Sequence, residues 1–143
     1  MIVTAESCTG GLLAATLTDI PGSSDIFDRG YVTYSNAAKQ AMLGVPAGIL
    51  ESQGAVSRAT AEAMARGALS NSDAHLAVSI TGIAGPGGGQ PDKPVGLVHL
   101  AVSSIFGQFL HEECRFGDIG RSHVRRASVA AALRMLQKLA DAR

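Results

Sequence analysis

The sequence has no tryptophan, only 4% aromatic residues, two cysteines and no excess of charge of either sign. Its 12 basic residues balance its 12 acidic residues, so nothing attracts the whole molecule to nucleic acid or to an anionic membrane. This balance excludes a polybasic binding protein as the first interpretation. No window approaches the roughly 18 consecutive apolar residues of a membrane span, and the N-terminus has no basic segment followed by an apolar one. We therefore expect neither a membrane-spanning segment nor a signal peptide.

Cysteine and histidine are too sparse to indicate a disulfide framework or a metal site. Cys8 and Cys114 form no CxxC motif, which predicts reduced thiols in a cytoplasmic protein. The four histidines show neither HxH nor HExxH spacing, so we predict no metal and no cofactor. We interpret as structural His75, His99, His111 and His123.

Small residues are abundant instead. Glycine contributes 17 residues and alanine more, which predicts close packing between backbones rather than a core filled by rings. A chain of 143 residues without a linker-like segment or an internal repeat predicts a single domain over residues 1–143.

Apolar periodicity alternates between strand-like and helix-like segments. The strands are expected over residues 2–6, 27–34, 76–81, 95–103 and 108–116. The helices are expected over residues 9–20, 36–43 and 56–69 and in a long C-terminal segment, the last three capped by Ser35, Ser57 and Asp118. The last two strands form a hairpin that turns near Gly107. The pattern predicts an α/β domain with a mixed sheet covered by helices, and such folds bind ligands in the loops that follow strands.

The first of these loops has the sequence AESCTGG. A serine at Ser7 would lie where free backbone N–H groups and the positive end of a helix can hold a nucleophile and an oxyanion. Two alternatives remain open. Ser7 or Thr9 caps the helix while Gly10 and Gly11 allow close packing, or Cys8 is the nucleophile. Cys8 also suits a small buried apolar position.

The second loop places Tyr34 and Lys39 on either side of a helix start. If Ser35 caps this helix, Lys39 lies in its first turn, where the helix dipole disfavours a cation. Partial burial would lower the pKa of Lys39 toward the range of a general base, and Tyr34 would relay a proton or orient the amine. The alternative is an exposed surface lysine beside a packed tyrosine.

The third loop follows Thr81 and has the sequence GIAGPGGG. It matches neither the phosphate-binding motif GxxxxGK[ST] nor the dinucleotide fingerprint, because Gln90 follows Gly85 and Gly87 where a third glycine is needed. Its amides can face an anion or a planar ring, and a flexible turn is the equal alternative.

Seven of the 12 basic residues fall in the C-terminal fifth of the chain. Arg121 and Arg125 share one helix face near the start of the last helix, where a phosphate would gain guanidinium and helix-terminus donors. We select Arg121 as the candidate. Arg126, Arg134 and Lys138 fit a solvated polar face.

Several strings, in matching order from Ile2 to Leu139, resemble the CinA C-terminal domain family. They are TAESCTGGLLAATLTDIPGSSDIF, RGYVTYSNAAKQAMLGV, GAVS, VSITGIAGPGGG, KPVGLVHLAV and FGDIGRSHVRRASVAAAL. The family includes the nicotinamide-nucleotide amidohydrolases. The resemblance implies a three-layer α/β/α sandwich with a mixed, mostly parallel sheet of about five strands.

The resemblance also implies a reaction, the hydrolysis of the carboxamide of nicotinamide mononucleotide to nicotinate mononucleotide and ammonia, in pyridine nucleotide salvage. By motif match, Ser7 corresponds to the nucleophile, Tyr34 and Lys39 to its activating pair, and Thr81 and Arg121 to further active-site positions. We expect backbone N–H groups of residues 8–11 to stabilise the oxyanion. Arg121 and the amides of residues 85–89 are the candidates for the ribose phosphate.

Two departures from the family pattern concern the N-terminal side of the chain. The family's usual N-terminal helix is missing, so we expect either a longer start or a second subunit covering that face, as in a homo-oligomer. Longer members carry a separate N-terminal domain, whose activity we do not transfer. The alternative function is a non-catalytic nucleotide-binding or assembly module linked to competence or DNA damage. We expect a small-molecule partner, and no nucleic acid or membrane.

Overall fold

Five strands form one mixed sheet in the computed structural model, which describes residues 1–142. The strands are β1 (Ile2–Glu6), β2 (Phe27–Val32), β3 (Leu76–Gly82), β4 (Leu97–Ser104) and β5 (Phe109–Arg115), in the spatial order β2-β1-β3-β4-β5. β1 pairs in parallel with β2 and β3, whereas β4 pairs antiparallel with β3 and β5. Because only β4 is reversed among these strands, the sheet is mixed and mostly parallel in direction, as predicted.

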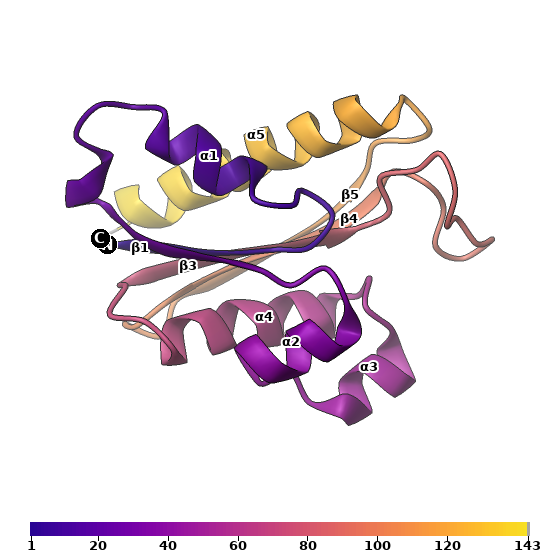
Figure 1. The fold of residues 1–143 in the computed structure, drawn as a ribbon, viewed down its shortest axis with the longest axis horizontal. Coiled ribbons are helices and arrows are strands. Elements are labelled where there is room, and N and C mark those ends of the chain that lie inside the picture. The colour runs from indigo at the N-terminus through magenta and orange to yellow at the C-terminus, as the bar shows by residue number, and fades with distance from the viewer. Residues whose placement is uncertain (143) are drawn as a thin grey trace.

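Helices cover both faces of the sheet (Figure 1). They are α1 (Leu12–Thr18), α2 (Asn36–Leu43), α3 (Ala47–Gln53), α4 (Arg58–Ser70) and α5 (Arg121–Asp141), with a short 3-10 helix at Ser23–Asp25. α1 and α5 lie on one face, and α2, α3 and α4 on the other, which confirms the three-layer α/β/α sandwich (Figure 1). Of the helices within residues 1–142, none is long and apolar enough to cross a membrane.

The two faces of the sheet are packed differently. Under α1 and α5, branched side chains of β3 and β4 such as Val78 and Leu100 meet α5 residues such as Met135. Under α4, the contacts are made mainly by alanines. A Cβ built at Gly67 of α4 would lie 1.9 Å from the carbonyl oxygen of Leu43, so α2 and α4 approach at backbone distance. The abundance of small residues therefore serves close packing, as expected.

Local capping chemistry accounts for the helices that were predicted well. α2 has the predicted bounds, because the Ser35 side chain accepts a hydrogen bond from the N–H of Ala38 and Gly44 ends the helix in the left-handed conformation. The Ser57 side chain likewise caps α4 by accepting from the N–H of Thr60. Both predicted caps are confirmed.

Several expectations differ from the structure, and among the strands the one expected over residues 27–34 ends at Val32. Asp118 does not cap the last helix, since α5 begins at Arg121 after Gly120, whose φ of 101° is a conformation that side chains disfavour. The helix α3 was not predicted. The helix expected over residues 9–20 is shorter, at Leu12–Thr18, because the preceding glycines form a turn.

The topology gathers several loops at one edge of the sheet. The parallel strands β1, β2 and β3 all end at this edge, and β5 runs in the same direction, so the chain also enters α5 there. The carboxyl ends of strands in such sheets form ligand sites. All three loops singled out in the sequence, and Arg121, come together at this edge.

Candidate active site

Lys39 and Ser7 are in direct contact at the carboxyl edge of the sheet. The Lys39 Nζ lies 3.0 Å from Ser7 Oγ, 2.8 Å from the carbonyl oxygen of Thr33 and 3.5 Å from that of Tyr34. β1 delivers Ser7, and α2 delivers Lys39 from the face of the sheet opposite α5 (Figure 1). Lys39 is 1% exposed, so the alternative of a surface lysine is wrong.

Burial lowers the pKa of Lys39 from its ordinary value, although the neighbouring Cys8 opposes this shift. The two carbonyl oxygens can only accept, so the amine donates to both, and Nζ also donates to the Ser7 hydroxyl oxygen. In the neutral form, the amine has a lone pair that can instead accept the proton of the Ser7 hydroxyl. A lysine arranged in this way can take a proton from the serine.

The start of α1 is capped by a carboxylate that the sequence analysis missed. Glu6, fully buried at the end of β1, accepts hydrogen bonds from the N–H groups of Leu13 at 2.8 Å and Ala14 at 3.1 Å. Gly11 is the N-cap residue and provides no side chain. Ser7 and Thr9 therefore do not cap the helix, and that alternative is wrong.

The backbone of the AESCTGG loop presents free donors beside Ser7. The N–H of Gly10 donates to the carbonyl oxygen of Ser7 at 3.0 Å, closing a turn. Within residues 1–142, the N–H groups of Cys8, Thr9 and Gly11 donate to no other residue. An oxyanion that forms next to Ser7 can accept from donors of this kind.

Cys8 points into the same region but has little thiolate character. Burial raises the pKa of the Cys8 thiol to about 11. The thiolate is the reactive form, so this thiol is a poor nucleophile near neutral pH. Ser7, with a lysine at its hydroxyl, is the better candidate.

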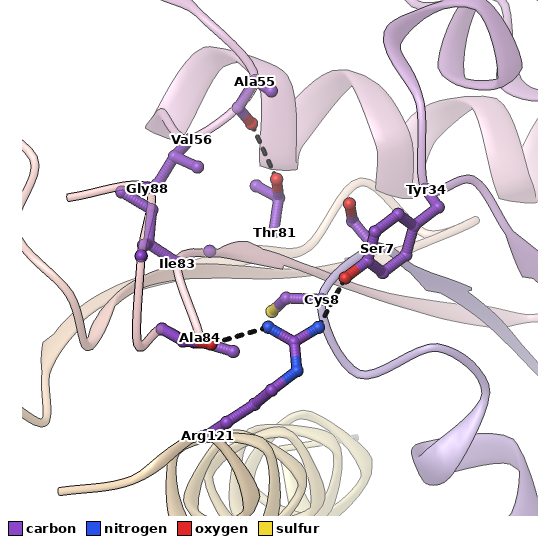
Figure 2. Close-up of a pocket in the computed structure, with 13 residues that line it drawn as sticks. Ser7, Cys8, Tyr34, Ala55, Val56, Thr81, Ile83, Ala84, Gly88 and Arg121 are labelled. Atoms are coloured by element: carbon purple, nitrogen blue, oxygen red, sulfur yellow. Dashed lines mark hydrogen bonds between the residues drawn. The ribbon is translucent and has the colours of Figure 1, made fainter. Parts of the chain in front are cut away.

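A cleft of about 260 Å³ opens beside Ser7 and Cys8 (Figure 2). Its far wall combines Ala55 and Val56 with parts of the 81–88 segment. The Thr81 hydroxyl donates to the carbonyl oxygen of Ala55 at 2.7 Å, which fixes the two parts of this wall to each other. Thr81, Gly85 and Gly87 thus line the cleft as the sequence analysis expected.

Arg121 connects the sides of the cleft (Figure 2). Its guanidinium donates to the carbonyl oxygen of Gly85 at 2.8 Å and to the Tyr34 hydroxyl at 2.6 Å. Tyr34 is 59% exposed, so it is not packed, contrary to the alternative considered for the second loop. Its hydroxyl is bonded to Arg121, while its carbonyl oxygen faces Lys39. The geometry does not provide the proposed proton relay from the phenol to the lysine.

Two other features lie outside the predicted set. Arg125 contacts the carbonyl oxygens of Cys8 and Thr9, a place that no pattern in the sequence indicates. His99 and His111 stack across β4 and β5, with ring centroids 5.2 Å apart. Among the described residues, no group of three or more His, Cys, Asp or Glu side chains could hold a metal ion.

The fold and the site define an α/β/α domain that carries a serine in contact with a buried lysine at the carboxyl edge of its sheet. The model of the CinA C-terminal domain family matches residues 1–140 of this chain. The chain belongs to the CinA C-terminal domain family.

Curated relatives and solved structures agree with this assignment. A CinA-like protein of Mycolicibacterium vanbaalenii is 51% identical over 137 residues, which are 96% of this chain and 32% of that protein. A CinA-like protein of Akkermansia muciniphila is 59% identical over 98 residues, 68% of this chain and 24% of that protein. This chain therefore spans about a third or less of the curated relatives it matches.

The crystal structure of the competence/damage inducible protein CihA from Agrobacterium tumefaciens superposes with a TM-score of 0.97 at 60% identity, covering 97% of this chain and 84% of that one. A CinA superfamily protein from Escherichia coli superposes with a TM-score of 0.91 at 37% identity, covering 96% of this chain and 79% of that one.

Proposed function

We propose that this chain hydrolyses the carboxamide of nicotinamide mononucleotide to nicotinate mononucleotide and ammonia. The observation that carries the proposal is the 3.0 Å contact between a buried lysine amine and the Ser7 hydroxyl. An uncompensated buried ammonium is costly, and no carboxylate forms an ion pair with Lys39 within the described chain. A neutral amine at a serine is a base–nucleophile pair.

The reaction begins when neutral Lys39 takes the Ser7 proton and Oγ attacks the carboxamide carbon. The backbone N–H groups of Cys8 and Thr9 donate to the resulting oxyanion. Lys39 then returns the proton to the nitrogen, the C–N bond breaks, and ammonia leaves a nicotinoyl ester on Ser7. Water, deprotonated by Lys39, attacks this ester, and the proton goes back to Ser7 as the acid departs.

The cleft suits a small planar ring with an anionic substituent. The pyridinium withdraws electrons from the carboxamide, which favours attack on its carbon. Arg121 is the one cation that lines the cleft, and no carboxylate does so among the described residues. Gly87 and Gly88 also line it, and their N–H groups donate to no backbone oxygen within residues 1–142. We assign the phosphate to Arg121 together with these amides.

Ammonia release from nicotinamide mononucleotide by the purified chain tests the proposal, with Ser7→Ala as the control. The expected result is turnover that Ser7→Ala abolishes. The name of the Agrobacterium structure refers to competence and damage, which keeps a binding or assembly module as the second candidate. Saturable nucleotide binding without ammonia release would support that candidate and overturn the hydrolase. We place the reaction in the cytoplasm, where Cys8 and Cys114 remain free thiols.

A further inference from the structure

Arg125 holds the loop that carries Ser7 from the side of the sheet opposite Lys39. Its Nε donates to the carbonyl oxygen of Cys8 at 3.2 Å, and its Nη2 donates to that of Thr9 at 3.0 Å. Arg125 belongs to α5, whereas Lys39 belongs to α2 on the other face (Figure 1). The residues that follow the candidate nucleophile are therefore fixed from one layer, and its hydroxyl is contacted from the other.

The two contacts of Arg125 determine the direction of the free amides. In a planar trans peptide the N–H points opposite to the C=O, so the bond to the Cys8 oxygen turns the Thr9 N–H away from Arg125. The bond to the Thr9 oxygen orients the Gly10 N–H in the same way. The Gly10 N–H donates to the carbonyl oxygen of Ser7, which belongs to the same peptide group as the Cys8 N–H. Three successive peptide groups are thus linked to one guanidinium.

The charge of Arg125 also acts on this loop. Within the described chain Arg125 forms no ion pair with a carboxylate, and its guanidinium donates to two carbonyl oxygens. Burial raises the pKa of the Cys8 thiol, and among charged groups Arg125 lowers it most. A negative charge that develops near Cys8 is therefore stabilised by this guanidinium.

We infer that Arg125 is a positioning residue that aligns the backbone N–H groups of Cys8 and Thr9 as oxyanion donors for attack by Ser7. The inference rests on the proposed serine chemistry and goes beyond it, because it assigns the alignment of the donors to a side chain that does not line the cleft.

The test compares Arg125→Ala and Arg125→Lys with Arg126→Ala. Arg126 is the adjacent, exposed arginine on α5, and its side chain makes no hydrogen bond or ion pair within residues 1–142. Two reactions are followed: ammonia release from nicotinamide mononucleotide, and p-nitrophenolate release from p-nitrophenyl acetate after subtraction of the rate of Ser7→Ala. The ester reports on the nucleophile and the oxyanion donors without needing the mononucleotide.

For Arg125→Ala we expect kcat to fall by about 10- to 100-fold with little change in KM, somewhat less than the 10²- to 10³-fold typical when an oxyanion donor itself is removed. Free guanidinium at low millimolar concentration should restore part of the lost kcat to Arg125→Ala and none to Ser7→Ala. Arg125→Lys should retain more activity than Arg125→Ala, and Arg126→Ala should match the wild type.

Other outcomes overturn the inference. An unchanged kcat in Arg125→Ala, or a loss that follows only the unfolded fraction and is not rescued by guanidinium, would give Arg125 a purely structural role. Failure of the proposed function is distinguishable from these results. A wild-type chain that cleaves the ester through Ser7 but releases no ammonia refutes the amide substrate, and the Arg125 variants are then judged on the ester. Absence of both activities refutes both proposals.

Discussion

Arg121 and Tyr34, which are 87 positions apart in the sequence, meet in a 2.6 Å hydrogen bond at the cleft. The same guanidinium reaches the carbonyl oxygen of Gly85, so one side chain connects α5, the end of β2 and the loop after β3. A guanidinium has five N–H donors, so donors remain for a ligand.

Arg121→Ala should weaken transition-state binding of nicotinamide mononucleotide by about 1.5–3 kcal/mol, as expected for a hydrogen bond to a charged group. It should have a much smaller effect on nicotinamide riboside, which lacks the phosphate. The measurement is kcat/KM for both substrates with both enzymes, expressed as a double ratio. Tyr34→Phe is the matched control, because it removes the tyrosine partner and leaves the guanidinium, so the preference for phosphate should persist. Equal losses on the two substrates would show that Arg121 supports the ring site or the fold.

Ser7→Ala should abolish ammonia release while the chain remains folded, whereas Cys8→Ala should keep most of it. The reason is the pKa of about 11 for the buried thiol, against a serine hydroxyl that faces an amine. Turnover and thermal unfolding are measured on both variants. The reverse pattern, an active Ser7→Ala and an inactive Cys8→Ala, would identify the thiol as the nucleophile.

The pH dependence of activity should follow Lys39. A base must be deprotonated, so kcat/KM should rise with pH along one ionisation below the ordinary lysine pKa of about 10.4. Lys39→Arg keeps the charge but cannot accept a proton, and it should lose about 10²- to 10⁴-fold in kcat. An active Lys39→Arg enzyme would leave the lysine an electrostatic role only.

The stability of the folded chain should change over the same pH range. The pKa of Lys39 is lowered in the folded state, so the unfolded chain binds the additional proton. The free energy of unfolding of the wild type, relative to Lys39→Met, should therefore rise as the pH increases from that lowered pKa toward about 10.4. Urea unfolding across this range measures it, and a difference that falls with pH would contradict the assigned shift.

Glu6→Gln should destabilise the chain by about 1–3 kcal/mol. A carboxylate accepts from both the Leu13 and the Ala14 N–H groups, but an amide offers one oxygen, so one buried donor loses its partner. Urea unfolding measures the loss. Glu51→Gln, at an exposed position on α3, is the control and should have little effect. Equal stability of the two variants would show that α1 does not depend on the Glu6 carboxylate.

The fold was predictable where local chemistry determines an element. Ser35 and Gly44 bound α2 from within a few residues, so its limits could be derived from the sequence. The start of α5 could not be derived in this way. Asp118 is a good capping residue by type, but the helix begins only after the backbone turns at Gly120. The seven residues of α3 lie between Pro46 and Gly54 and are too few for a clear periodic pattern.

The candidate site was predictable in composition but not in geometry. The strand–loop pattern and the family resemblance selected Ser7 and Lys39. Ser7 does not cap α1 because Glu6 accepts hydrogen bonds from the N–H groups at the start of that helix. Glu6 belongs to a strand, whereas sequence rules for capping consider only the residues next to the helix start. Arg125 reaches Thr9 across 116 positions, and no local pattern indicates such a contact.

The contact between Ser7 and Lys39 exists only after β1 and β2 have paired, since the Thr33 N–H donates to the Glu6 carbonyl and the Thr33 carbonyl receives the lysine. Parallel pairing closes a long loop and forms late relative to local helices. In an unfolded or partly folded chain the lysine returns to its ordinary pKa and the serine is an ordinary hydroxyl. On the proposed serine chemistry, acylation of Ser7 by an activated ester would report on folding, because the serine would become reactive only once β1 and β2 have paired.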